Sequence, residues 1–324
     1  MTNGREAWKS AHEAGGDSPP QKPAAWDVAV AYRIYPHVAP TALGLPCSED
    51  KLRLSEICLR SFKRSLGTLR VKLWVLLDGC PEEYAALFRR HFDPQDLVLL
   101  SLPGVGNLAT FGKQMDLLLE QEASDLVYFA EDDYLYLPNQ FPKMVEYLRD
   151  HDDVDFVSPY DHPDCYTLEI HRNPKWVRVY AGHHWRTAAS TCLTFLTRKE
   201  TLRQSETVFR TYCQRNHDCS MWLSLTKKSV FSPGRFSRFL FREPAWAKMM
   251  ARAWLRGWPQ ILFGKRMGLW IPIPGMATHL DLQRLSPGVD WRRLMEDETE
   301  ALAVENARRL RHVASADRSA RRGS

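Results

Sequence analysis

The sequence of 324 residues contains no run of about 18 apolar residues, so no segment is expected to span a membrane. Residues 1–25 are rich in glycine, proline and charge, and they lack the basic-then-apolar pattern of a secretion signal. A segment of this composition buries too little apolar surface to fold alone. We expect a disordered leader there.

The chain also lacks Cys-x-x-Cys pairs. Its seven cysteines are scattered, at positions 47, 58, 80, 165, 192, 213 and 219. An odd, scattered set of cysteines is typical of a reducing compartment, where thiols stay free. The predicted location is therefore the cytoplasm.

A broad excess of positive charge is absent too. The formal net charge of +5 is concentrated in residues 307–324, which hold six Arg and one Asp, and the rest of the chain carries equal numbers of basic and acidic residues. A near-neutral body lacks the basic surface of a nucleic-acid-binding protein. No nucleic-acid partner is expected, although a disordered basic tail over residues 314–324 leaves contact with RNA or anionic lipid open.

Strand and helix patterns alternate through the first half of the chain. The strand patterns cover residues 28–35, 71–77, 97–102 and 125–130, and the helix patterns cover residues 48–66, 81–91 and 108–121. This order predicts an α/β fold with a parallel, Rossmann-like sheet and helices on both faces. Further on, we expect helices at 140–150, 207–225 and 290–313, and strands at 155–158, 190–197 and 229–232.

Three adjacent carboxylates, Glu131, Asp132 and Asp133, directly follow the apolar run Asp-Leu-Val-Tyr-Phe-Ala at 125–130. They therefore lie at the end of a predicted strand, where open α/β sheets bind ligands. Burying three carboxylates without compensation costs several kcal/mol, so a divalent cation held by oxygen ligands is a natural partner. Mg²⁺ or Mn²⁺ is the expected cofactor.

With this motif at this strand end, the chain resembles the nucleotide-sugar-dependent glycosyltransferases of the GT-A fold, particularly the family 2 type. Those enzymes have an amino-terminal Rossmann-like sheet that ends in an Asp-x-Asp metal motif, and Glu-Asp-Asp looks like the version in some N-acetylglucosaminyltransferases. The resemblance spans about residues 28–225, with a weaker echo near His279. It implies that Asp133 binds the metal directly, while Glu131 and Asp132 contact the ribose or metal-bound water.

The same resemblance implies an activity. It implies an inverting transfer of a hexosyl or N-acetylhexosaminyl group from a nucleoside diphosphate sugar to a hydroxyl of a glycan or lipid-linked acceptor. Such a reaction belongs in cell-surface polysaccharide or glycolipid synthesis. His279, in Pro-Gly-Met-Ala-Thr-His at 274–279, is then a second metal ligand. The alternative is a histidine that is only hydrogen-bonded in a loop.

Two strand ends depart from the family pattern. The first strand ends in Tyr-Arg-Ile-Tyr at 32–35 instead of Pro-Thr/Ala-Tyr-Asn, and the second ends in a single Asp78-Gly79 instead of Asp-Asp-Gly. For the donor, we expect Asp78 to accept a hydrogen bond from the base, and Tyr32 or Arg33 to stack on or flank the ring. Asp78-Gly79 is alternatively only a turn.

A helix before the metal strand carries Lys113 and Gln114 where family members carry Arg and Asn. The resemblance places both residues close to the diphosphate, where a cation is physically favourable. The alternative for Lys113 is a solvated helix face.

Asp218, in Asn-His-Asp-Cys-Ser-Met-Trp at 216–222, lies where inverting family 2 enzymes carry a catalytic acid before an apolar helix. The resemblance makes it the base that takes the acceptor proton. The alternative is a helix cap, and the two roles are compatible.

Two further polar clusters are expected to shape the acceptor side, with loop packing as the alternative for the His pair at 183–184. The first cluster is Asp161, His162 and Asp164, and the second cluster is His183, His184, Trp185 and Arg186.

Residues 246–258 form a basic, aromatic helix pattern. Trp246, Met250, Trp254 and Trp258 recur at a spacing of four, and Lys248, Arg252 and Arg256 share that spacing about 200° away around the helix. An aromatic stripe of this kind packs on the catalytic domain or lies on a lipid interface. The second alternative adds a peripheral membrane contact, at the inner face of the membrane.

Two rival functions remain open. A metal-dependent nucleotidyltransferase or phosphodiesterase also uses paired acids on such a sheet, but normally shows a Gly-rich phosphate loop, and residues 32–46 contain one glycine. The other rival is a non-catalytic sugar-nucleotide-binding or peripheral membrane partner protein. An absence of activity in the wild type would favour that partner protein. Activity that survives Asp218→Asn but is abolished by Asp133→Asn would mean that the base is misassigned.

The expected domain organisation follows from these segments. A GT-A catalytic domain covers residues 26–235, with a nucleotide-sugar half at about 26–138 and an acceptor half at about 139–235. Residues 236–270 form the basic aromatic segment. Residues 271–313 complete the site and form the terminal helix.

Overall fold

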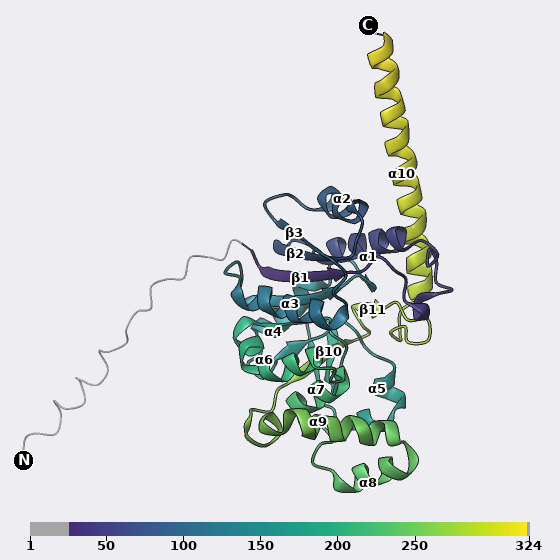
Figure 1. Ribbon diagram of the computed structural model, residues 1–324. Coiled ribbons are helices and arrows are strands. Elements are labelled where there is room, and N and C mark those ends of the chain that lie inside the picture. The colour runs from purple at the N-terminus through teal and green to yellow at the C-terminus, as the bar shows by residue number, and fades with distance from the viewer. Residues whose placement is uncertain (1–25, 323–324) are drawn as a thin grey trace, which may run out of the picture.

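The computed structural model describes residues 26–322 of the chain (Figure 1). The predicted leader at 1–25 and residues 323–324 lie outside the described residues. Within 26–322, nine strands form one central sheet: β1 Val28–Ile34, β2 Val71–Asp78, β3 Leu97–Leu102, β4 Leu126–Glu131, β6 Phe156–Val157, β7 Val177–Tyr180, β8 His183–Thr187, β9 Phe195–Arg198 and β10 Leu269–Ile273. Their order across the sheet is β3-β2-β1-β4-β9-β6-β10-β8-β7.

The first four strands are parallel. β1 pairs with β2 on one side and with β4 on the other, so that Val30 lies opposite both Leu73 and Tyr128. Every residue of β1 is buried, as expected for a central strand of a parallel sheet that is covered on both faces. This half confirms the predicted Rossmann-like sheet.

The second half of the sheet is mixed. β9 runs antiparallel to both β4 and β6, β10 is parallel to β6, and β8 and β7 continue antiparallel at the edge. The strand predicted at 229–232 does not form; this segment is a turn in which Ser229 has a left-handed φ of 67°. A residue with that backbone conformation cannot extend a strand.

Helices cover both faces of the sheet. Their bounds are α1 Lys51–Ser65, α2 Glu82–His91, α3 Asn107–Glu120, α4 Phe141–Arg149, α5 Asp164–Thr167, α6 Lys199–Cys213, α7 Asp218–Thr226, α8 Pro233–Arg242, α9 Pro244–Phe263 and α10 Trp291–Arg322, with short 3₁₀ turns η1 Pro40–Ala42 and η2 Glu169–His171. On one face, α1, α2 and α4 pack on the alternate residues Val28, Val30 and Tyr32 of β1. On the other face, α3, α6 and α7 pack around Ala29 and Ala31.

The helix predicted at 207–225 is two helices, α6 and α7. The chain breaks between them at Arg215, whose φ of 65° is left-handed and ends α6. α9 packs closely on α7 because Gly257 has no side chain; a Cβ there would lie 2.3 Å from the hydroxyl oxygen of Ser224. α8 lies beside α9, and together they form one end of the molecule (Figure 1).

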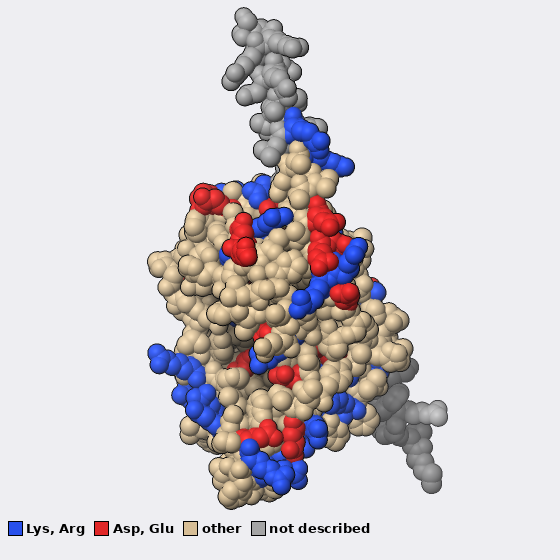
Figure 2. Space-filling model, turned by 90° about the vertical axis from the view of Figure 1, so that its right-hand side faces the viewer, with Lys and Arg blue, Asp and Glu red and all other residues tan. Residues whose placement is uncertain are grey.

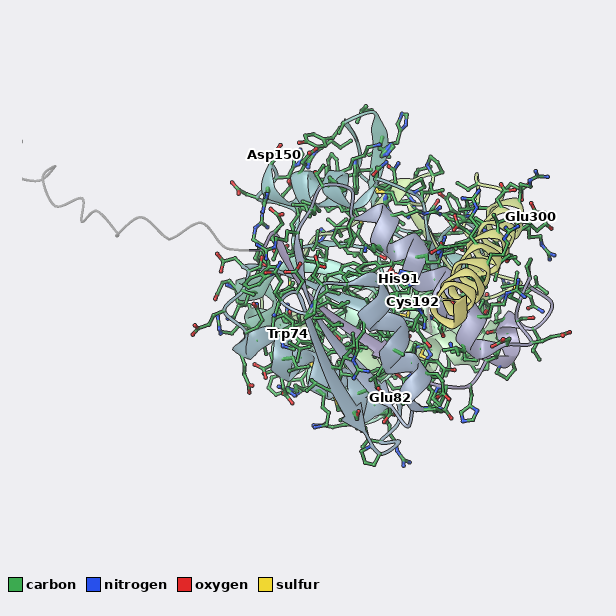
Figure 3. The ribbon with its side chains drawn as sticks, turned by 90° about the horizontal axis from the view of Figure 1, so that it is seen from above. Trp74, Glu82, His91, Asp150, Cys192 and Glu300 are labelled. Carbon is green, nitrogen blue, oxygen red and sulfur yellow. The ribbon has the colours of Figure 1, made fainter. Side chains whose placement is uncertain are left out.

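α10 begins near the core and then projects from the body (Figure 1). Its first turns bury Trp291, Met295 and Leu302 against α1. The helix runs to Arg322, past residue 313, where we expected a helix end and a disordered tail. The last turns are rich in Ala and Arg, which are strong helix formers. Seen from above, α10 with Glu300 lies at one side of the sheet (Figure 3).

A small second sheet positions a residue from far along the chain. β5 Tyr134–Tyr136 pairs antiparallel with β11 Ala277–His279, and His279 lies opposite Tyr134. This pairing brings His279 next to the end of β4. No helix within residues 26–322 is both long enough and apolar enough to cross a membrane.

Candidate functional site

The acid triplet forms the turn between β4 and β5. β4 ends at Glu131 beside β1, where Arg33 lies opposite Glu131, and this is the point at which the strand order reverses. In open α/β sheets, ligands bind at such a point, outside the carboxyl ends of the strands. A cavity of about 520 Å³ lies there, and its lining includes Tyr35, Lys51 and Asn107 as well as the triplet. The face of the molecule in Figure 2 is hollowed across its middle, and acidic and basic side chains gather in the hollow.

Each carboxylate of the triplet has its own cation. The pairs are Glu131 with Arg33, Asp132 with Lys51 (Oδ2 to Nζ, 2.6 Å) and Asp133 with His279 (Oδ2 to Nε2, 3.1 Å). The expectation of three uncompensated carboxylates is therefore wrong, because the fold supplies three balancing groups from β1, α1 and β11. A metal ion is not needed to make the triplet compatible with burial.

The pair of Asp133 and His279 is strongly polarised. Burial raises the pKa of Asp133, but the charge and hydrogen bond of His279 outweigh burial and hold that pKa well below its usual range. Burial lowers the pKa of His279, and the charge and hydrogen bond of Asp133 outweigh it and raise the pKa to about 9. At neutral pH the pair is therefore a carboxylate and an imidazolium.

Asp133 retains one unused ligand atom. Its Oδ1 is buried and has no hydrogen-bond partner among the residues that the structure describes, whereas Oδ2 contacts His279. Among residues 26–322, no three His, Cys, Asp or Glu side chains converge as a metal cage. The carboxylate oxygen of Asp133 fits a hard divalent cation, and His279 fits as a second ligand once its imidazole has lost its proton. The other ligands of such a cation have to come from a bound phosphate or water.

Arg33 and Tyr32 have different surroundings because successive side chains of a strand point to opposite faces. Arg33 lines the cavity, where its guanidinium pairs with Glu131 and donates to the backbone oxygen of Asn107 at 3.2 Å. Tyr32 is only 1% exposed and packs between Phe62 and Phe88, with ring centroids 5.9 and 5.3 Å away. Tyr32 therefore cannot stack on a base, and that prediction is wrong.

Asp78 is more than a turn residue. Its two carboxylate oxygens accept the backbone N–H groups of Val105 (2.7 Å) and Gly106 (2.8 Å). Gly104 and Gly106 have φ of 83° and 84°, a left-handed conformation that glycine adopts at little cost. Asp78 thus fixes the loop before α3 and forms part of the cavity wall. A contact from Asp78 to a base stays a prediction.

Lys113 and Gln114 lie away from the cavity. Lys113 is exposed on α3, and the buried Gln114 donates from Nε2 to the carbonyl oxygens of Ala31 (2.8 Å) and Ala130 (3.1 Å). Gln114 thereby bridges β1 and β4. Both residues are about two turns from the start of α3, and each turn advances about 5.4 Å, so the first-turn residue Asn107 lines the cavity instead. The predicted diphosphate contact of the buried Gln114 is wrong, whereas that of the exposed Lys113 stays a prediction.

The cluster expected on the acceptor side is largely structural. Asp161 and Arg186 form a fully buried ion pair (Oδ1 to Nη2, 2.6 Å), and the Tyr166 hydroxyl donates to Asp161 at 2.6 Å. Trp185 is buried and stacks on Tyr147, with ring centroids 4.0 Å apart. These side chains cannot reach an acceptor. His184 is exposed on the edge pair of β7 and β8, and its predicted role stays untested.

The buried pair gives a testable effect on stability. We expect Asp161→Asn to lower the free energy of unfolding by about 3–5 kcal/mol, because it leaves the Arg186 charge buried without a counter-ion. The matched control is Glu200→Gln, which removes the partner of Arg203 in an exposed pair and should cost less than about 1 kcal/mol. Urea denaturation measures both changes. Equal small effects would mean that the pair is not buried in solution.

Asp218 is the first residue of α7. The helix N-cap is His217, and the Asp218 carboxylate itself accepts the backbone N–H of Cys219 at 2.6 Å, so Asp218 does contribute to capping this helix. The Asp218 carboxylate lies 2.6 Å from Nδ1 of His217, and this contact raises the pKa of His217. The carboxylate is partly exposed and is free of any Lys or Arg partner among the residues described.

Asp218 lies outside the cavity lining, and its charge acts on a tyrosine that contacts the lining. Burial raises the pKa of Tyr212, the charge of Arg33 lowers it, and the charges of Glu131 and Asp218 add to the rise. The Tyr212 hydroxyl accepts the side-chain amide of Asn107 at 3.0 Å. The charges of two carboxylates from different halves of the chain thus both raise the pKa of this hydroxyl, which contacts the cavity-lining Asn107.

No protein-family model matches the sequence, and no curated protein matches it. The structure is similar to the mannosyltransferase PcManGT from Pyrobaculum calidifontis in complex with GDP-Man and Mn²⁺ (TM-score 0.39, 13% identity, 72% of this chain and 73% of that chain). It is also similar to the galactosyltransferase LgtC with donor and acceptor sugar analogues (0.40, 11%, 84% and 95%) and to S. aureus TarS with UDP-GlcNAc (0.35, 12%, 56% and 48%). All three are glycosyltransferases, the class of protein that the sequence motif resembles. Likenesses this weak say nothing about substrate or activity in this chain.

Several residues of the site were missed by the sequence analysis. Lys51 pairs with Asp132 across 81 positions of sequence, and no local pattern distinguishes it from other lysines at a helix start. Thr194 donates to Glu131 at 2.8 Å from the segment before β9. Tyr35 and His37 line the cavity, with ring centroids 4.8 Å apart. The sequence could have indicated these two residues, because both directly follow the first strand, at the edge of the sheet where ligands bind.

Proposed function

We propose that this chain is a glycosyltransferase that moves a sugar from a nucleoside diphosphate sugar to a hydroxyl acceptor, with a divalent cation bound at Asp133. The observation that carries the proposal is the state of Asp133. It lines the cavity at the sheet reversal, and one of its carboxylate oxygens is buried with no hydrogen-bond partner within residues 26–322. A buried oxygen of this kind normally has a hydrogen-bond donor or a cation beside it.

The cavity suits a nucleoside diphosphate. Its volume of about 520 Å³ falls in the usual range for small-molecule sites, about 300–1,000 Å³. Arg33 and Lys51 line the cavity, and so do Gly106 and Asn107 at the amino terminus of α3. Cations and a helix amino terminus both favour a phosphate.

The outer part of the cavity suits the base. Tyr35 is 51% exposed and lies against the ring of His37, so one of its faces is available for stacking. Asp78 holds the opposite wall through the loop before α3.

This placement predicts how loss of the Tyr35 ring changes the affinity for a nucleoside diphosphate. We expect Tyr35→Ala to weaken nucleoside diphosphate binding about tenfold, since stacking of a base on an aromatic ring contributes roughly 1–3 kcal/mol. Tyr35→Phe keeps the ring and should bind like the wild type. Isothermal titration with the preferred nucleotide measures both affinities. Equal affinity of Tyr35→Ala and wild type would mean that the base does not stack on Tyr35.

A divalent cation on Asp133 would act as a Lewis acid that stabilises the departing diphosphate. The chain's own groups have separate tasks. Asp133 and His279 hold the cation, and Lys51 holds Asp132 in place. Arg33 fixes Glu131, whose other oxygen accepts the Thr194 hydroxyl.

Asp218 is the proposed base that removes the proton from the acceptor hydroxyl. It is partly exposed, it has no Lys or Arg partner among the described residues, and its charge reaches the same hydroxyl as that of Glu131. A carboxylate on the acceptor side is what direct displacement with inversion requires. The acceptor is then a hydroxyl of a glycan or of a lipid-linked sugar that enters from the α7 side.

The experiment is a donor screen with the purified chain. UDP, GDP, CDP and dTDP derivatives of hexoses and N-acetylhexosamines are incubated with Mn²⁺, and nucleotide release is measured with and without simple glycoside acceptors. We expect release from the sugars of one nucleotide, increased by an acceptor. Binding of a sugar nucleotide without release or transfer would favour a non-catalytic binding protein instead.

A further inference from the structure

The surface of α8 and α9 carries large apolar side chains in water. The pair lies at the end of the molecule opposite α2 and the projecting α10 (Figure 1). Phe241 is 83% exposed, Phe263 80%, Leu255 75% and Trp258 50%. Large apolar side chains grouped on one surface mark an interaction site more often than a free surface.

Most of the aromatic stripe expected at 246–258 does not contribute to this exposed surface. Met250 is 1% exposed, and Trp246 and Trp254 pack partly buried in the same cluster. The indole N–H of Trp254 donates to the carbonyl oxygen of Val230 at 2.9 Å. For these residues the packing interpretation is confirmed. Trp258, in contrast, is exposed.

α9 has three distinct faces. Because each residue turns the helix by about 100°, positions 247, 250, 254, 257 and 261 form one stripe, and this stripe is buried or packed. The next stripe, one residue on, holds Ala251, Leu255, Trp258 and Leu262, and all four are exposed. Lys248, Arg252 and Arg256 lie about a further 100° around. An exposed apolar stripe therefore runs between the packed face and a basic face, and it continues past the kink at Gly257.

The charge of this surface is almost all positive. Residues 233–266 contain eight Lys and Arg residues and one acidic residue, Glu243. Arg238 pairs with Glu169, and Lys265 pairs with Asp155 at 3.0 Å. Among the residues described, the other six cations of this segment have no ion-pair partner. Arg235 and Arg256 donate hydrogen bonds to neutral groups, and the remaining four are Arg242, Lys248, Arg252 and Arg266.

We propose that the α8–α9 surface docks on an anionic lipid bilayer. An apolar stripe with bulky aromatic side chains beside a basic face is the pattern of a helix that lies in the plane of a membrane interface. Tryptophan and phenylalanine insert at the headgroup boundary, and the unpaired cations contact anionic headgroups. A second copy of this chain is a poor occupant, because a symmetric dimer would place the two basic patches against each other. The inference does not depend on the proposed transfer reaction.

The experiment is co-sedimentation of the full chain with vesicles of two compositions. One contains three parts phosphatidylcholine and one part phosphatidylglycerol, and the other contains phosphatidylcholine alone. We expect binding to the anionic vesicles that is at least about tenfold stronger than to the neutral ones, and that weakens as salt is added.

Two variants separate the apolar and the charged contributions. The triple change Leu255→Ser, Trp258→Ser and Leu262→Ser should abolish sedimentation, and Arg242→Glu with Lys248→Glu and Arg252→Glu should remove the preference for anionic vesicles. The matched controls lie on other exposed surfaces. They are Trp176→Ser with Val179→Ser, just before and on β7, and Arg89→Glu with Lys113→Glu, on α2 and α3.

The controls should sediment like the wild type, and thermal unfolding verifies that every variant is folded. Wild-type protein that stays in the supernatant with anionic vesicles at low salt would overturn the proposal. Undiminished sedimentation of the folded serine triple variant would also overturn it. A wild-type dimer that the serine variant dissociates in sedimentation velocity would assign the surface to a second copy instead.

Discussion

Asp133→Asn is expected to reduce sugar transfer by at least about a hundredfold. Loss of a residue that merely supports a metal ligand costs roughly 10–100-fold in metal affinity or activity, and Asp133 is the proposed ligand itself. The amide keeps the volume of the carboxylate but replaces a charged oxygen by an N–H donor, so the buried Oδ1 position loses its affinity for a cation. Nucleotide release in the presence of saturating Mn²⁺ measures the effect.

A matched control for Asp133 lies at the opposite end of β4. Asp125 is an exposed carboxylate next to the other end of β4, and Asp125→Asn should transfer sugar at the wild-type rate. The melting temperature of both variants shows whether the fold is retained. A folded Asp133→Asn variant with wild-type transfer would mean that the triplet does not hold the metal.

Asp218→Asn is expected to lower kcat by a factor of about 10²–10⁴, the usual contribution of a general base, and to leave donor affinity unchanged. The reason is that Asp218 lies outside the cavity lining, at the start of α7, with a partly exposed carboxylate. Steady-state kinetics with varied donor and varied acceptor separate kcat from binding.

Asp290 provides the control for this variant. It also lies at the start of a helix, where it accepts the N–H of Arg293 at 3.1 Å, and Asp290→Asn should not change kcat. Asp164, a partly exposed carboxylate beside His162, is the competing base. If Asp164→Asn loses kcat while Asp218→Asn retains it, the base has been misassigned.

The parallel half of the sheet could be predicted because its signals are local. β4 is a continuous apolar run that ends in three charges, which places the triplet at a strand end without any knowledge of tertiary contacts. The face of each β1 side chain could not be predicted in the same way. All seven residues of β1 are buried, so no alternation of apolar and polar residues distinguishes Tyr32, which packs in the core, from Arg33, which lines the cavity.

Contacts between distant segments account for the other errors. The compensation of Asp132 by Lys51 depends on how α1 packs beside β5, and that of Asp133 by His279 on the pairing of β5 with β11. Arg186 was predicted to contact the acceptor because its side chain is charged. Its ion pair with Asp161 compensates that charge, so the side chain is buried instead. Burial of a paired charge leaves no trace in a single sequence.

The central claim, that Asp133 holds a cation that binds a nucleoside diphosphate, is tested most directly by thermal unfolding. The wild type and Asp133→Asn are heated with UDP, GDP, CDP or dTDP, each with and without Mn²⁺. A ligand at about a hundred times its dissociation constant adds roughly 2.7 kcal/mol of stability, which shifts the melting temperature measurably. We expect one nucleotide to stabilise the wild type only when Mn²⁺ is present, and no nucleotide to stabilise Asp133→Asn. Stabilisation of neither protein by any nucleotide, or equal stabilisation of both without Mn²⁺, would contradict the claim.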